Sequence, residues 1–424
     1  MNLGVFREFK YDYYGSILLV MAFLLPWNSI MRVPIACIAG LLLVLAVREY
    51  LKKDKKVNYS VVILFSSLFL AALLRWLIEP SNANGLKKLE TQVLLFIFPI
   101  AIFLHGQMRQ KQYFNILKIY VVSSLILITF IFSKALFNYV FIPHNWNVPS
   151  DYFFYTDLAA NIDAHPTYLS LGLMVSIISS FALFENGNLT KSKLAITLSL
   201  LIFTILLLNS RIVTVVSIIL MLILIVKSFK FNYRLLLVFA VTISLFSILA
   251  YYFLSYHARP NRQFSFDFSE IEETMSKRIV DSKSSGLTVR LLIWDMSFDA
   301  IKEAIWIGAG TGNAKNTLAK EYSKNNVEYL IAADLGPHNM YISILLELGV
   351  IGLIIFLIFV VVTINKAAHA NNLYYVLILL PFLVVFLVET ILSKFSGVVI
   401  YSFFTCYFYN QPVKRTTQLY NTSL

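Results

Sequence analysis

The sequence predicts an all-α polytopic membrane protein with about 12 transmembrane helices. Hydrophobic residues make up 58% of the 424-residue chain and charged residues only 14%, and the mean hydropathy is +0.74. Soluble domains are far more polar. Apolar runs close to the ~20 residues that a helix needs to cross a bilayer recur from Tyr14 to the C-terminal region.

Each predicted transmembrane helix is an apolar run that ends at charged or turn-forming residues. The first run lacks a small-residue cleavage site, so it is predicted to remain as a membrane anchor. The predicted segments are 14–30, 32–48, 59–78, 91–107, 117–137, 166–184, 193–209, 212–227, 234–256, 339–363, 373–392 and 396–410.

The charges of the connections predict which side of the membrane each one faces. With a cytoplasmic N-terminus, most Lys and Arg residues of the connections fall in the cytoplasm, as the positive-inside rule requires. The alternate 138–165 connection has no Lys or Arg but contains Asp151, Asp157 and Asp163. Both termini are therefore predicted to be cytoplasmic. This bias explains the net charge of +12 without a nucleic-acid partner.

A second long outer connection, residues 257–337, is predicted to be a periplasmic loop between the ninth and tenth helices of a single integral membrane domain, 1–424. Its 10 basic and 11 acidic residues make it nearly neutral and water-exposed. Loops of this length are usually functional or disordered. An amphipathic helix is predicted within it, on the outer membrane surface or capping the bundle, because apolar residues recur at helical spacing at Trp294, Phe298, Ile301 and Ile305.

Arg211 is the single ionisable residue between Leu194 and Val226, and an arginine in hydrocarbon costs ~3 kcal/mol. One helix over this stretch would be ~50 Å long, which exceeds the bilayer thickness. Asn209 and Ser210 favour a turn. The sequence therefore predicts two short helices, with Arg211 at the tip of their hairpin on the outer face.

Three inward-running helices are predicted to begin at the outer face beside a side chain that can bind an anion. His165 precedes a proline that favours a first helical turn, His338 and Asn339 follow a Gly-Pro pair, and Arg211 begins the third helix. Free backbone N–H groups and the helix dipole attract anions at such ends. Arg290 of the long loop adds a second guanidinium, which suits phosphate oxygens.

Simpler structural roles remain open for these residues. Arg211 is also consistent with a topology marker, His165 with a helix cap, and Arg290 with an ion pair to Asp295. The two intramembrane carboxylates, Glu347 and Glu389, also have a structural alternative. Carboxylates inside the membrane are usually functional, but they also pair with buried cations.

Two patterns argue against metal or nucleotide chemistry. The "GAGTGN" stretch, 308–313, lacks the Lys-Ser/Thr of a phosphate-binding loop and is predicted to be a turn. Cys37 and Cys406 lie far apart in apolar runs, so neither a disulfide nor a metal site is predicted.

The pattern His338–Asn339, nine residues, Gly349, two residues, Gly352 resembles the motif that ends the long periplasmic loop of the bacterial O-antigen ligase family. The related O-antigen polymerases share it in looser form. The resemblance extends to the number of segments, the large outer loop, Arg211 and Arg290. It implies a GT-C-like membrane glycosyltransferase in the bacterial inner membrane. Such an enzyme transfers a glycan from undecaprenyl diphosphate to a sugar hydroxyl of lipid A-core at the periplasmic face, with inversion and without metal, nucleotide or other cofactor.

This chemistry gives each candidate residue a role. Histidine titrates near neutral pH, so His338 is the candidate general base for the acceptor hydroxyl. Arg211 and Arg290 are the candidate ligands of the diphosphate, whose charge grows as it leaves. Three further residues are candidates for binding substrate: His165, Asn339 and Glu389.

Two alternatives differ in what the glycan is joined to, or in whether it is joined at all. A polysaccharide polymerase would add repeat units to a lipid-linked chain by the same chemistry, although the chain length and the well-formed motif favour the ligase. A polyprenyl-glycan flippase should place charged groups near the bilayer midplane. Here only Glu347 lies deep, and the cations gather at the outer end, so the flippase is less favoured.

Overall fold

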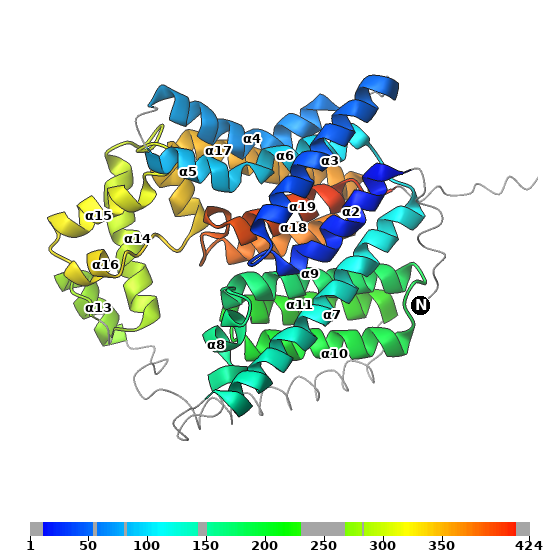
Figure 1. The fold of residues 1–424 in the computed structure, drawn as a ribbon. Coiled ribbons are helices and arrows are strands. Elements are labelled where there is room, and N and C mark those ends of the chain that lie inside the picture. Colours follow the sequence, from blue (N-terminus) through cyan, green and yellow to red (C-terminus); the bar gives the residue numbers. More distant parts are fainter. Residues whose placement is uncertain are drawn as a thin grey trace, which may run out of the picture.

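The computed structural model describes residues 12–53, 57–79, 83–142, 151–229, 268–281 and 284–412. Every regular element in these ranges is helical, which confirms the all-α prediction (Figure 1). Among them, seven spans are long and apolar enough to cross a membrane: α3 (Arg32–Lys53), α4 (Tyr59–Ile78), α5 and α6 together (Ala83–Gln92 and Leu94–His105), α7 (Gln110–Phe141), α9 (Pro166–Glu185), α11 (Arg211–Phe229) and α17 (Met340–His369).

Four shorter apolar helices complete the bundle in the described residues. Together with the seven long spans, they overlap every predicted segment except 234–256, which lies outside the described residues. The shorter helices are α2 (Tyr13–Leu24), which continues into the 3₁₀ turn η1 (Leu25–Trp27), α10 (Lys191–Leu207), α18 (Leu373–Val385) and α19 (Phe395–Tyr409).

The hairpin predicted around Arg211 is confirmed. The first helix of the pair, α10, ends at Leu207, and α11 begins at Arg211. Asn209 between them has a φ of 47°, a left-handed conformation that asparagine tolerates better than most residues. The chain therefore turns sharply here instead of continuing as one long helix.

The predicted end of segment 373–392 is wrong, because α18 stops at Val385. Beyond it the chain turns, so that the Phe386 carbonyl accepts a hydrogen bond of 2.7 Å from the backbone N–H of Met340, at the start of α17. Glu389 therefore lies in the turn that follows α18. The short 3₁₀ helix η3 (Ile391–Ser393) then leads into α19.

Helix α9 forms the centre of the bundle. It contacts α7, α10, α11, α18 and α19, and 89% of its membrane-spanning window is buried. Its buried surface includes Gly172, Ser176 and Ser180, small residues that let neighbouring helices approach closely. Ser176 also hydrogen-bonds Ser124 of α7 at 2.8 Å. A helix packed on all sides is a rigid support for the residue that begins it, which is His165.

Four helices gather at one end of the bundle, next to α5 and the beginning of α17 (Figure 1). We call this group the cap, and the end of the bundle that carries it the cap end. Its core combines Leu292 and Met296 with Ile342 and Leu346 of α17, so the cap is packed onto the membrane helices. The cap consists of α13 (Phe268–Lys277), α14 (Gly286–Lys302), α15 (Ala314–Lys324) and α16 (Glu328–Ala332).

The amphipathic helix predicted in the long loop exists as α14, but its predicted apolar face is only partly right. Phe298 is 52% exposed, and Ile305, 45% exposed, lies beyond the end of the helix. The buried face is rotated towards Leu292, Ile293 and Met296. These three side chains pack in the cap core, so contacts with the rest of the cap and with α17 determine which face of α14 is buried.

Helix α17 is broken at Gly349, which has a φ of 65° and a ψ of −165°. Residues 305–310, here called the inserted segment, enter the break and bind the backbone groups that it frees. The amides of Ala309 and Gly310 donate to Leu346 and Glu347, and those of residues 350 and 351 donate to 305 and 306, over 2.8–3.2 Å. The side chain of Arg75 in α4 holds the inserted segment by donating to the carbonyls of residues 307 and 308.

Gly349→Ala is expected to lower the melting temperature of the purified protein by several degrees. An added Cβ would lie 2.3 Å from the Trp306 carbonyl carbon, and a left-handed φ alone costs an L-residue ~1–2 kcal/mol. The measurement is thermal unfolding in detergent, followed by tryptophan fluorescence. Gly40→Ala in α3 is the control, because a Cβ there meets nothing within 4 Å. Equal melting temperatures for the two variants would contradict this account of the break.

Candidate functional site

His338 projects from the beginning of α17, where the local sequence fixes its backbone. The side-chain oxygen of Asn339 caps the helix by accepting from the amides of Tyr341 and Ile342 at 2.9 and 3.1 Å. On the other side, the Trp294 indole of α14 donates to the Pro337 carbonyl at 2.9 Å. His338 itself has a φ of 44°, a conformation that histidine adopts more readily than most side chains. The cap and the helix start thus hold the backbone of His338 from both sides.

Glu389 lies between two of the candidate residues. Its Oε2 is 3.7 Å from Nδ1 of His338, and its Oε1 accepts from the guanidinium of Arg290 at 3.4 Å. The glutamate side chain is 18% exposed, and Nδ1 of His338 is buried without a hydrogen-bond partner. A shift of a few tenths of an ångström would turn the 3.7 Å contact into a hydrogen bond. This arrangement joins α14, the turn after α18 and the start of α17.

His165 caps the central helix and belongs to the same site as His338 and Glu389. Its Nδ1 accepts a hydrogen bond of 3.3 Å from the backbone amide of Thr167, so the capping role weighed from the sequence is present. Desolvation by the surrounding protein lowers the pKa of His165; the charge of Glu389 raises it, and those of His338 and Lys394 lower it. Glu389, His338 and Lys394 therefore all lie within electrostatic reach of His165.

Arg211 lies at the start of α11, next to the start of α9. The two helix starts are joined by the Ser210 hydroxyl, which donates to the Thr167 hydroxyl at 3.2 Å. Thr167 is two residues from His165, and Ser210 directly precedes Arg211. The guanidinium is solvent-exposed. The helix starts at His165 and Arg211 therefore lie side by side at the cap end.

We call the side chains of His165, Arg211, Arg290, His338 and Glu389 the cluster. It is predominantly cationic and contains one carboxylate. No group of three or more metal-binding side chains occurs among the described residues. Guanidinium and imidazole groups around helix starts, where backbone N–H groups also point outward, suit an anionic ligand with several oxygens. The single carboxylate, Glu389, faces a histidine and an arginine, so it can orient both.

Residues 196–357 match the protein family described as O-antigen ligase. The chain therefore carries an O-antigen ligase family domain over these residues. The matched region includes Arg211, Arg290, His338 and the glycine at the helix break, so it covers most of the cluster described above. No curated protein matches the chain.

In this matched region, the glycine part of the sequence motif has a structural explanation. Gly349 forms the helix break, and a Cβ on Gly308 of the inserted segment would lie 2.5 Å from the Glu347 carbonyl carbon. The 308–313 stretch is a turn, as predicted, with positive φ at Gly308, Gly310 and Gly312. The glycines let two backbones cross closely, whereas the His-Asn part of the motif builds the cluster.

The site also contains Lys394, which no sequence pattern singled out. It precedes α19 and is exposed, and its charge reaches His165. In the sequence, Lys394 is a lone cation in a short connection, on the side of the membrane that is predicted to contain few cations. Position alone did not distinguish it from a topology marker.

Glu347 lies away from the cluster and pairs with Lys88 of α5 at 3.2 Å. This agrees with the structural alternative that an intramembrane carboxylate pairs with a buried cation. Lys88 lies on a helix that enters the bundle, although the sequence analysis placed residues 79–90 in a connection. The protein therefore carries a buried ion pair as well as the cluster.

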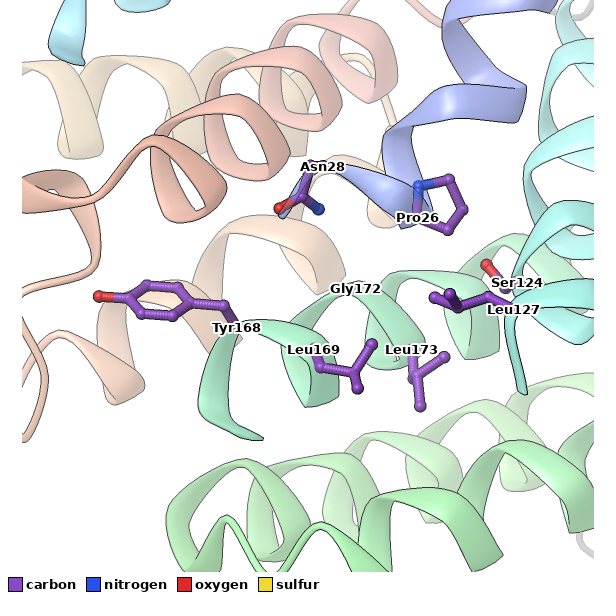
Figure 2. A pocket seen from close by; sticks show the side chains of 8 residues that line it. All are labelled: Pro26, Asn28, Ser124, Leu127, Tyr168, Leu169, Gly172 and Leu173. Carbon is purple, nitrogen blue, oxygen red and sulfur yellow. The ribbon is translucent and has the colours of Figure 1, made fainter. Parts of the chain in front are cut away.

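A small pocket lies beside the cluster, below the start of α9. Its walls come from η1 and the residue after it, from α7 and from α9, and Figure 2 shows the Tyr168 hydroxyl pointing away from Leu169 and Leu173. The ring of Tyr168 packs edge-on against His165, with 5.7 Å between the ring centroids. The lining residues are Pro26, Asn28, Ser124, Leu127, Tyr168, Leu169, Gly172 and Leu173.

Proposed function

We propose that this chain is an O-antigen ligase that transfers a glycan from undecaprenyl diphosphate to a sugar hydroxyl of lipid A-core, at the periplasmic face of the inner membrane. The observation that carries the proposal is the placement of Glu389 between His338 and Arg290, beside the helix starts at His165 and Arg211. This placement brings a candidate base and a guanidinium to the same carboxylate, close to two further helix starts that can attract an anion. The distribution of charge among the loops supports a periplasmic cap end.

In the proposed reaction, the acceptor hydroxyl gives its proton to His338 as its oxygen attacks the anomeric carbon of the donor sugar. A new carbon–oxygen bond forms, and the bond between the anomeric carbon and the diphosphate oxygen breaks. The leaving diphosphate takes the electron pair, and the single displacement inverts the anomeric centre. His338 acts as the general base.

The neighbours of His338 support the two charges that develop. Glu389 faces Nδ1 of the imidazole, and a carboxylate in that position orients the ring and stabilises the imidazolium. Arg290 and Arg211 supply guanidinium groups to the diphosphate, whose negative charge grows as the bond breaks. Asn339 uses its side-chain oxygen to cap α17, which leaves its amide N–H groups for substrate. His165 is placed to bind either substrate.

The acceptor distinguishes a ligase from a polymerase. The test is reconstitution of the purified protein with undecaprenyl-diphosphate glycan and, in separate arms, lipid A-core or a second lipid-linked glycan. Glycan attached to lipid A-core is the expected product. Extension of the lipid-linked glycan alone would assign the chain to the polymerases. Movement of unreacted donor between leaflets without any transfer would identify a flippase and overturn the proposal.

Chelation of divalent metal is expected to leave transfer unchanged. In the proposed mechanism, Arg211 and Arg290 provide the positive charge that a divalent ion supplies in many other transferases. The measurement is the initial rate of transfer with and without excess EDTA in reconstituted vesicles. Abolition of transfer by EDTA, with recovery after a divalent metal is added back, would assign charge stabilisation to a metal ion.

A further inference from the structure

Helix α5 carries a lysine that is buried below the cluster and contacts two separate elements. Nζ of Lys88 is 3.2 Å from Oε1 of Glu347 in α17 and donates to the Ser393 hydroxyl of η3 at 2.9 Å. The Lys88 and Glu347 side chains are each only 9% exposed. One turn further along α5, the Gln92 amide donates to the Leu392 carbonyl at 3.0 Å. Helix α5 therefore holds α17 and η3 in a fixed relation.

Both contacted elements continue into the cluster. Glu347 ends the half-helix that begins beside His338, because the break at Gly349 separates it from the rest of α17. Ser393 lies four residues after Glu389. The ammonium group of Lys88 thus touches the two chain segments on which His338 and Glu389 are placed.

We propose that Lys88 is a positioning residue for glycan transfer. Through Glu347 it fixes the half-helix that carries His338, and through Ser393 it fixes the turn that carries Glu389. It thereby sets the separation between the imidazole and the carboxylate. Lys88 contacts neither substrate, since Glu347 is nine residues from His338, or ~13 Å by helical rise. This inference rests on the proposed function.

A role in positioning accounts for a feature that stability alone does not explain. A buried ion pair pays for desolvation of both charges, and well-packed apolar residues often hold helices together equally well. The ammonium also makes a second contact, to a hydroxyl on a separate segment, which a pair of apolar side chains cannot reproduce. Directional contacts to two segments fix the position of one segment relative to the other. A catalytic site needs such supporting contacts, because its side chains must be held within about 0.5 Å of the productive geometry.

The test compares a double variant, Lys88→Met/Glu347→Gln, with the parent protein. Changing both residues avoids leaving an unpaired buried charge. The variant is expected to purify as a monodisperse, folded protein, to keep the KM for the lipid-linked donor within about twofold, and to lose about tenfold or more in kcat, since a misplacement of ~1 Å can cost as much as 10²-fold in rate. Lys87→Met is the matched control, because Lys87 is adjacent on α5 and exposed, and it should behave as the parent does.

Ser393→Ala provides a second measurement that leaves the ion pair intact. It removes only the contact between Lys88 and η3, and a reduction of about threefold in kcat with an unchanged melting temperature is expected. If the double variant does not fold, this single variant decides the question. A parent-like kcat in a folded double variant, or in Ser393→Ala when the double variant does not fold, overturns the positioning role. Unchanged transfer after His338→Ala would instead remove the proposed function.

Discussion

His338→Ala is expected to reduce glycan transfer by roughly 10²–10⁴-fold, the usual contribution of a general base. The acceptor hydroxyl would then have to lose its proton without a positioned acceptor. The fold should survive, because the Asn339 cap and the indole contact to Pro337 do not involve the imidazole. Initial rates in reconstituted vesicles, with melting temperatures measured alongside, separate the loss of catalysis from the loss of structure.

The left-handed backbone at residue 338 requires two further variants. His338→Asn keeps a side chain that tolerates positive φ but cannot serve as a base, so it should be as inactive as the alanine variant. His369→Ala is the control at the opposite end of the same helix, where the imidazole is exposed and its Nδ1 lies 2.7 Å from the Asn365 carbonyl oxygen. Parent-like transfer by His338→Asn would show that the reaction proceeds without a base at this position.

Much of the fold was predictable from the sequence because transmembrane helices are encoded locally. The length of each apolar run fixes a span, and a proline, a Gly-Pro pair or an Asn-Ser turn marks where the next helix begins. The helix starts at His165, Arg211 and His338 were therefore placed correctly. Loop charges indicated in addition that all three face the same side.

The remaining features depend on contacts between residues far apart in the chain. Arg75 binds the carbonyl of Gly308, 233 residues later, and Lys88 pairs with Glu347, 259 residues later. No periodicity within a single segment encodes such partners. The same limit applies to Glu389: the sequence marked it as a candidate substrate ligand, but its place between His338 and Arg290 depends on the turn after α18.

Arg290→Ala is expected to lower kcat by roughly 10²–10³-fold, the loss that follows removal of one charge-stabilising donor from a transition state. Arg290→Lys should recover only part of the rate, because a lysine keeps the charge but not the planar fork that fits two phosphate oxygens. Arg211→Ala should show a similar defect, since it removes the second guanidinium. Rates and donor affinities in reconstituted vesicles measure both effects.

The cap offers a control that separates diphosphate binding from folding of the cap. Arg278 binds Asp295 and Asp299 on the same helix that carries Arg290, at 2.9 and 2.8 Å. Arg278→Ala should loosen α13 without changing kcat, because its partners are partly exposed and exposed ion pairs contribute only ~0–1 kcal/mol. If Arg278→Ala and Arg290→Ala lost activity equally, the effect would belong to cap stability. A loss confined to Arg290 and Arg211 would locate the leaving diphosphate between α14 and the start of α11.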